Sequence, residues 1–212
     1  MIDTWPIIGV DESGKGDFFG PLVVAGVLAE REQVPLLAGW GVRDSKTIAD
    51  RRIIEMAAKI RQAFIVDVVV IGPEKYNELY GRIRNLNRLL GWGHARVIEN
   101  ILAKKPAPAA LSDKFGDDRF IVDSLQKEGK KIELIQMVRG EAHPAVAAAS
   151  VVARAEFLRR MDMLSTEYQV VLPRGASAAV DAVGRELVRK NGPGILDKIA
   201  KRHFKNYQKI IC

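Results

Sequence analysis

Two short apolar segments near the start of the chain, joined by a turn rich in glycine, constrain the fold more than any other feature. Residues 7–10 read Ile-Ile-Gly-Val and residues 22–28 are rich in valine, which is typical of buried strands. The nine residues between Glu12 and Leu22 include three glycines and a proline, and glycine permits tight turns and close approach of the backbone to a ligand. We therefore predict an antiparallel strand pair, whose first strand ends at Asp11 and Glu12.

The rest of the chain alternates between strand-like and helical patterns. Further strands are predicted at 64–71, 109–112 and 132–138. Helices are predicted over a segment containing Ile53 to Ile60, at 74–80, at about 86–104, at 145–161, and in two segments separated by residues 192–194. Strands followed by alternating strands and helices indicate an α/β fold with a mixed central β-sheet flanked by helices. We predict one domain over residues 1–212, with a basic helical C-terminal part from about residue 176.

Several classes of protein are disfavoured by the composition. No apolar run approaches the roughly 18 residues that a membrane helix needs. The N-terminus, Met1-Ile2-Asp3, lacks the basic region of a signal peptide. The only cysteine is Cys212, which fits a reducing compartment without disulfides. These observations predict a cytoplasmic protein.

Most of the net charge of +7 comes from the last thirty residues. Only Glu186 and Asp197 oppose eight basic residues there, which are Arg185, Arg189, Lys190, Lys198, Lys201, Arg202, Lys205 and Lys209. Such a cluster suits a polyphosphate backbone, and a well-solvated terminal helix explains it equally well.

Acidic residues follow three of the predicted strands. Asp11 and Glu12 follow the first strand, Asp113 ends the strand at 109–112, and Glu141 comes after the strand at 132–138. Carboxylates at the edge of a core need a cation or a basic partner, although a solvated turn is the alternative for each. Four carboxylates without a cysteine cluster favour Mg²⁺ or Mn²⁺, and two such ions about 3.5–4 Å apart promote in-line hydrolysis of a phosphodiester. Because successive strand residues point to opposite faces, Asp11 and Glu12 converge only if the strand ends or bends there.

Several motifs together resemble the prokaryotic type 2 and type 3 ribonucleases H. Residues 9–21 resemble their first motif, and Asp17-Phe18-Phe19-Gly20-Pro21 resembles the type 3 version, ribonuclease HIII. Further matching segments lie in the family's order at 44–46, 85–87, 92–95, 112–115, 140–143, 147–150, 172–177 and 200–205. The resemblance covers nearly the whole chain.

This resemblance implies a ribonuclease H-like fold and an endonuclease that cuts the RNA strand of RNA/DNA hybrids, leaving a 5′-phosphate and a 3′-hydroxyl. It implies two divalent ions, Mg²⁺ or Mn²⁺. A monomer suits an enzyme that grips a duplex, and we expect no obligate protein partner and no membrane. The implied catalytic and metal-binding residues are Asp11, Glu12, Asp113 and Glu141. The implied substrate-binding residues are Gly14, Lys15, Gly16, Lys46 and Ser150, and the basic C-terminal helices are implied to hold the duplex.

One departure from the type 3 pattern concerns the N-terminus. Type 3 enzymes usually carry a substrate-binding domain there, whereas the first predicted strand begins at Ile7, so we predict that this domain is lacking. Incision at single ribonucleotides in duplex DNA, as in type 2 enzymes, is therefore the alternative activity. A binding module that has lost catalysis and an unrelated two-metal hydrolase are further alternatives, and His94 is predicted to be a structural histidine of a helix.

Overall fold

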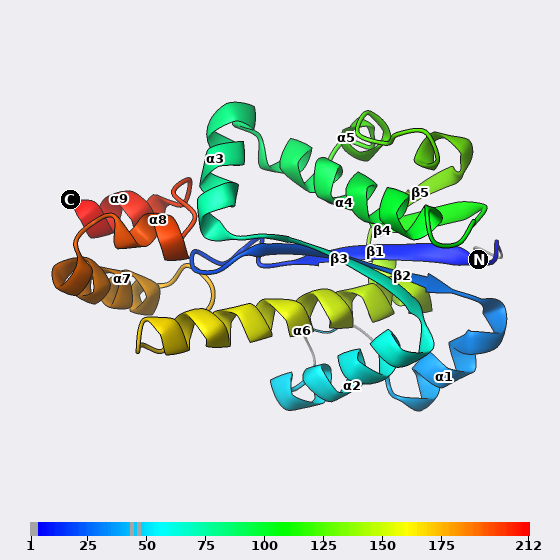
Figure 1. The fold of residues 1–212 in the computed structure, drawn as a ribbon, viewed down its shortest axis with the longest axis horizontal. Helices are drawn as coiled ribbons and strands as arrows, with labels where there is room; N and C mark the ends of the chain where they lie inside the picture. The colour runs from blue at the N-terminus through cyan, green and yellow to red at the C-terminus, as the bar shows by residue number, and fades with distance from the viewer. Residues whose placement is uncertain (1–3, 43–44, 46–47) are drawn as a thin grey trace. The chain divides into compact units, whose positions relative to one another are not determined.

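The structure is a computed structural model that describes residues 4–42, 45 and 48–212. Five strands run through it (Figure 1), namely β1 (Ile7–Ser13), β2 (Leu22–Ala29), β3 (Ile65–Ile71), β4 (Ala109–Asp113) and β5 (Glu133–Met137). The α-helices are α1 (Val34–Gly39), α2 (Asp50–Ala63), α3 (Pro73–Ile83), α4 (Leu86–Leu102), α5 (Arg119–Val122), α6 (Pro144–Glu167), α7 (Ala178–Asn191), α8 (Ile195–Ile199) and α9 (Lys205–Ile211).

The five strands form one mixed sheet in the order β3-β2-β1-β4-β5, which confirms the predicted fold class. Strand β1 pairs in parallel with β4, and β4 pairs in parallel with β5. The register places Val10 beside Ser112, and Asp113 beside Met137. The carboxyl ends of these three strands therefore lie at the same edge of the sheet, where open α/β sheets usually bind ligands.

The chain divides into two compact units, and the first comprises the described residues within 1–12, 24–69 and 85–155. In this sheet unit, α4 and α5 lie over one face of the strands, while α1, α2 and the first half of α6 lie over the other (Figure 1). Apolar residues of β1, β2, β4 and α4 form a continuous core, with Ile8, Val10 and Ile98 fully buried. Helix α4 begins after Asn85, whose side chain accepts a hydrogen bond from the Arg88 backbone N–H.

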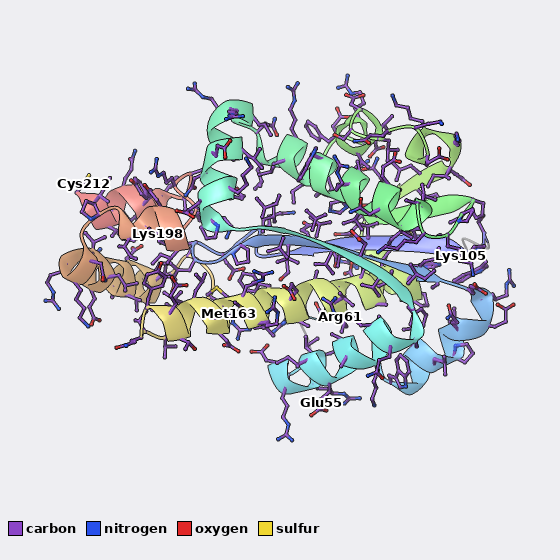
Figure 2. All side chains as sticks on the ribbon, in the orientation of Figure 1. Glu55, Arg61, Lys105, Met163, Lys198 and Cys212 are labelled. Carbon is purple, nitrogen blue, oxygen red and sulfur yellow. The ribbon has the colours of Figure 1, made fainter. Side chains whose placement is uncertain are left out.

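The second unit comprises residues 13–23, 70–84 and 156–212, and we call it the C-terminal unit. It contains the turn between β1 and β2, helix α3, the second half of α6, and helices α7 to α9. Of the two helices predicted on either side of residues 192–194, the first is found as α7, whereas the segment after residue 194 forms two short helices, α8 and α9, instead of one. Cys212 is exposed at the end of α9 (Figure 2).

The predicted end of the first strand is wrong. Strand β1 continues to Ser13, so Asp11 and Glu12 lie within it rather than after it. Both side chains have hydrogen-bond partners of their own, which offsets the cost of placing two acids in a largely buried strand. Among the described residues, no helix has both the length and the apolar character required to span a bilayer.

Candidate active site

Three of the predicted acidic residues lie at the carboxyl edge of the sheet. Asp11 and Glu12 directly follow Val10 of β1, and Asp113 directly follows Ser112, the β4 residue that pairs with Val10. The parallel register therefore brings the acidic end of β1 alongside that of β4. The negative charges of Glu12 and Asp113 both act on Asp11 and raise its pKa.

Asp11 is the most strongly perturbed carboxyl group of this edge. Burial, followed by the negative charges of Glu12 and Asp113, raises its pKa to about 7. Two hydrogen bonds oppose this rise: the Glu12 backbone N–H donates to Asp11 Oδ1 at 2.8 Å, and the Ser150 side chain bonds to the carboxylate. Ser150 belongs to α6, which covers one face of the sheet, so the Asp11 side chain lies on that face.

Glu12 lies on the other face. Its Oε2 is 3.1 Å from Nε2 of His94 in α4, and its side chain is 9% exposed while His94 is fully buried. The Nδ1 atom of the same ring is 2.9 Å from Oγ of Ser112. Adjacent strand residues thus follow the expected alternation between faces, and each acid is held by a helix on its own face.

Asp113 and Glu141 are linked through the short 3₁₀ segment Gly140–Ala142. The Gly140 backbone N–H donates to Asp113 Oδ1 at 2.8 Å. A β-carbon on Gly140 would lie 3.0 Å from the Asp113 Cα atom, so the segment packs directly on the end of β4. Glu141 follows Gly140 and is half-buried, and this packing places its backbone next to Asp113.

Within the described ranges, no three His, Cys, Asp or Glu side chains are arranged so that they could hold a metal ion. The four-carboxylate metal site therefore stays a prediction. Lys46, a predicted phosphate contact, and Asp44 lie outside the described residues. Ser150 is 5% exposed, and its hydroxyl is 2.7 Å from Oγ of Ser45 in addition to its contact with Asp11.

The glycine-rich turn is held within the C-terminal unit by a buried lysine. The Lys201 ammonium donates to the backbone carbonyls of Asp17 and Gly20, both at 2.7 Å, and lies 3.4 Å from that of Phe19. Lys201 is fully buried, and burial lowers its pKa to about 7 although the Asp17 charge opposes this. The turn also needs glycine at position 14, where φ is +88° and a β-carbon would meet the Pro21 carbonyl oxygen at 2.2 Å.

The buried position of Lys201 removes one residue from the basic cluster that was predicted to hold the duplex. This residue is one of the eight basic residues in the cluster, but it cannot contact phosphate from its buried position. Lys190 and Arg202 form ion pairs with Glu186 and Asp197, respectively. Lys198 lies on α8 in the same unit (Figure 2).

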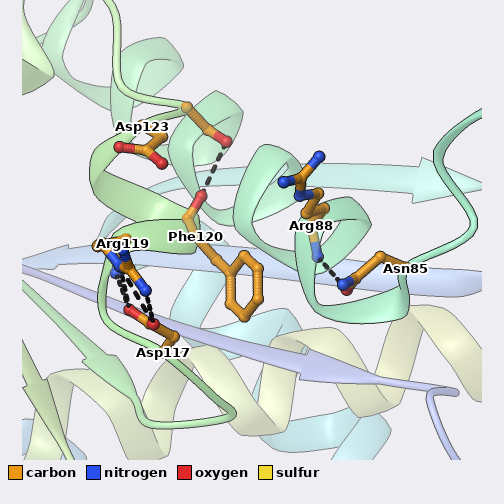
Figure 3. Close-up of a pocket in the computed structure, with 7 residues that line it drawn as sticks. Asn85, Arg88, Asp117, Arg119, Phe120 and Asp123 are labelled. Atoms are coloured by element: carbon orange, nitrogen blue, oxygen red, sulfur yellow. Dashed lines mark hydrogen bonds and ion pairs between the residues drawn. The ribbon is translucent and has the colours of Figure 1, made fainter.

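A cavity of about 640 Å³ lies elsewhere in the sheet unit, near the start of α4 and α5 (Figure 3). It is lined by Asn85, Arg88, Asp117, Arg119, Phe120, Asp123 and Ser124, and thus contains none of the four predicted catalytic acids. The Arg119 guanidinium is occupied by both oxygens of Asp117. Asp117 therefore forms an exposed ion pair with Arg119.

Three residues of this arrangement were missed by sequence reasoning. His94 contacts Glu12 and Ser112 only because α4 packs on the sheet, and the spacing of these residues in sequence gives no indication of this. Lys201 lies among basic residues, which makes it look like part of a solvated surface. The one available signal was Ser112 itself, a polar residue that directly follows the apolar run Ala109 to Leu111.

Comparisons with known proteins agree with this fold and with the sequence motifs. A family model described as Ribonuclease HII matches residues 8–207. Ribonuclease HIII of Chlamydia pneumoniae is 47% identical over 98% of this chain and 71% of its own length, and that of Protochlamydia amoebophila is 42% identical over 99% and 70%. The crystal structure of Bst-RNase HIII in complex with Mn²⁺ is similar, with a TM-score of 0.90 and 31% identity over 97% of this chain and 68% of that one. Aquifex aeolicus RNase H3 has a TM-score of 0.79 at 27% identity, covering 96% of this chain and 74% of that one. Because the family model and these relatives match nearly the whole chain, the chain belongs to the ribonuclease HII family, and the relatives named above are ribonucleases HIII.

Proposed function

We propose that this protein is an endoribonuclease that hydrolyses the RNA strand of RNA/DNA hybrids, leaving a 5′-phosphate and a 3′-hydroxyl. Membership of the ribonuclease HII family and similarity to ribonuclease HIII support the activity. The observation that carries the proposed site is the parallel register that brings the acidic ends of β1 and β4 side by side, where burial and then the charges of Glu12 and Asp113 raise the pKa of Asp11 to about 7.

The donor chemistry of this edge fits hard divalent cations. Carboxylate oxygens are the ligands that Mg²⁺ and Mn²⁺ prefer, and a cluster of repelling carboxylates is stabilised when a cation neutralises it. We assign Asp11, Glu12, Asp113 and Glu141 as the residues that hold two such ions. When bound, the ions supply Lewis-acid activation of water and neutralise charge on the phosphodiester. The similar Bst-RNase HIII structure contains Mn²⁺, which supports a divalent ion but does not select between the two metals.

The protein's own residues hold the acidic side chains in place. Ser150 and the Glu12 backbone hold the Asp11 carboxylate on one face of β1, and His94 holds Glu12 on the other. The Gly140 N–H holds Asp113. We assign Gly14, Lys15 and Gly16 to contacts with phosphate and sugar of the RNA strand, because backbone N–H groups in such a turn and a lysine suit anionic oxygens. Recognition of the 2′-hydroxyl is assigned to the same segment.

The decisive experiment compares two substrates in Mg²⁺ or Mn²⁺: an RNA strand paired with DNA, and a DNA duplex containing one ribonucleotide. We expect efficient cleavage of the first, with products that carry a 5′-phosphate. Efficient cleavage of the second alone would replace this proposal with the type 2-like activity.

The variant Asp113→Asn tests the assigned residues. Mutating a residue that hydrogen-bonds to a metal ligand typically lowers metal affinity or activity by about 10–100-fold. Removing the charge of a ligand itself should therefore reduce turnover by more than about 100-fold. The matched control is Asp118→Asn, because Asp118 is an exposed acid five residues further along that pairs with Lys114. We expect the control to keep parental activity. Turnover in D113N equal to that of the control would remove Asp113 from the site.

A further inference from the structure

A buried chain of hydrogen bonds connects two of the proposed metal ligands. It runs from Glu12 Oε2 to His94 Nε2 over 3.1 Å, and from His94 Nδ1 to Ser112 Oγ over 2.9 Å. Ser112 Oγ is also 2.9 Å from the backbone carbonyl oxygen of Asp113. The chain therefore joins the acidic end of β1 to that of β4 through one side chain of α4.

The hydrogen-bonding capacity of the ring fixes its orientation. A carboxylate can only accept hydrogen bonds, so the proton on His94 Nε2 points at Glu12. The other ring nitrogen faces the Ser112 hydroxyl, whose single proton can be donated either to His94 Nδ1 or to the Asp113 carbonyl oxygen, so all three contacts are hydrogen bonds at once only when both ring nitrogens carry a proton. Both ring nitrogens thus contact residues at the carboxyl edge of the sheet, and neither caps or stabilises α4 itself.

The residues around His94 explain how α4 brings the imidazole ring close to the sheet. The sequence Gly-Trp-Gly-His at 91–94 puts two glycines just before the histidine. A β-carbon on Gly93 would approach Val24 of β2 to 2.9 Å, so the missing side chain lets α4 lie close to the sheet. The Phe115 ring packs against the imidazole with ring centroids 4.9 Å apart. His94 is consequently fully buried and can move little away from Glu12.

Burial of an imidazole at this position has a free-energy cost that an apolar side chain would avoid. The residues around it, including Val97 and Ile98, form the apolar core of the sheet unit. A polar group in such a place is tolerated only when its hydrogen bonds are made, and both are made to site residues. Carboxylates that bind metals are commonly held by such outer partners, which set their orientation.

We propose that His94 is a positioning residue that orients Glu12 for metal binding and, through Ser112, fixes the spacing between the ends of β1 and β4. This inference rests on the proposed function, because it takes Glu12 and Asp113 as metal ligands. It assigns His94 a role beyond the structural one that sequence alone predicts.

The test measures binding of Mn²⁺ to the purified full chain by isothermal titration calorimetry, and thermal unfolding in EDTA in parallel. His94→Phe removes both ring nitrogens and keeps a planar ring, and we expect Mn²⁺ affinity to fall about 10–100-fold. His94→Gln places an amide N–H donor toward Glu12, and we expect it to recover most of the affinity. Ser112→Ala keeps the contact between His94 and Glu12, and we expect a smaller, several-fold loss.

A purely structural histidine predicts a different pattern. In that case H94F and S112A lower the melting temperature while the Mn²⁺ affinity of the folded protein stays at the parental value, and this result would overturn the proposal. If H94F does not fold, the result for S112A tests the proposal by itself. Weakened Mn²⁺ binding in S112A supports the link from His94 through Ser112, and unchanged binding refutes it.

Glu12→Gln separates this inference from the proposed function. Parental Mn²⁺ affinity in E12Q would refute the metal site itself. Loss of Mn²⁺ binding in E12Q, together with parental affinity in folded H94F and in S112A, would refute only the role of His94.

Discussion

Substituting Gly9 with alanine should weaken both the fold and the site, because α6 packs directly on this residue of β1. A β-carbon at position 9 would lie 2.1 Å from the carbonyl carbon of Ala145, 2.3 Å from its oxygen and 2.4 Å from the backbone N of Val146. Carbon atoms in contact are normally about 3.5–4.0 Å apart, so the helix and the strand must separate by more than about 1 Å. All three atoms belong to backbone, so rotation of a side chain cannot relieve the clash.

Overpacking of this kind costs about 1–3 kcal/mol, and backbone clashes belong at the upper end or beyond it. About 3 kcal/mol in a chain of this size corresponds to a fall in melting temperature of about 6–12 °C. The same displacement would carry Ser150 of α6 away from Asp11, with which its side chain bonds. Because a misplacement of about 1 Å can cost about 100-fold in rate, cleavage by the folded G9A variant should fall by a comparable factor.

Thermal unfolding followed by circular dichroism in EDTA, with cleavage measured well below the transition, tests both effects. Gly81→Ala is the matched control, because Gly81 is exposed in α3 and a β-carbon there meets nothing within 4 Å. Alanine is the better helix former, so G81A should gain roughly 0.5–1 kcal/mol. A melting temperature of G9A within about 2 °C of the parent would refute this prediction, because a clash with backbone atoms should lower the melting temperature by more than that.

Three further substitutions test the charges of the molecule. Asp11→Asn removes one of three repelling carboxylates, so we expect a higher melting temperature than the parent in EDTA and loss of the stabilisation that Mn²⁺ gives the parent. Lys15→Ala should weaken hybrid binding by a similar factor for all sequences and lower the slope of log affinity against log salt by about 1. For Lys201, the unfolded chain holds the side-chain proton up to about pH 10.5, whereas the folded chain releases it near pH 7. The unfolded state therefore binds more protons in this window, and the unfolding free energy should rise with pH by up to about 5 kcal/mol. Urea unfolding at several pH values should show this rise in the parent and not in Lys201→Met.

The long elements of the fold could be predicted because their signals are local. The helix predicted at 86–104 is found at Leu86–Leu102, where Asn85 caps its start and Pro106 follows its end. The strand predicted at 64–71 is found at Ile65–Ile71. The short helices α1 and α5 were not predicted, because segments of four to six residues carry too little periodicity to be distinguished from turns.

The acids could be predicted as a group, but their supports could not. Their position after apolar runs is visible in the sequence, and the parallel register then brings Asp11 and Asp113 together. In contrast, the environment of Lys201 depends on residues about 180 positions earlier in the chain. A lysine whose ammonium is surrounded by backbone carbonyls has the same sequence signature as a lysine in solvent, so only tertiary structure separates them.

Two adjacent acids on one strand require a particular architecture to work together. Because Asp11 and Glu12 point to opposite faces of β1, each needs its own support, and a strand with one solvated face would leave one of them unsupported. Strand β1 is the middle strand of the sheet, and its apolar run Ile7 to Val10 is buried throughout, as expected for a strand covered on both faces. Helix α6 supplies Ser150 on one face and α4 supplies His94 on the other. The close approach of α6 at Gly9 and of α4 at Gly93 therefore serves the site as well as the core, because a wider separation on either face would release one of the two carboxylates.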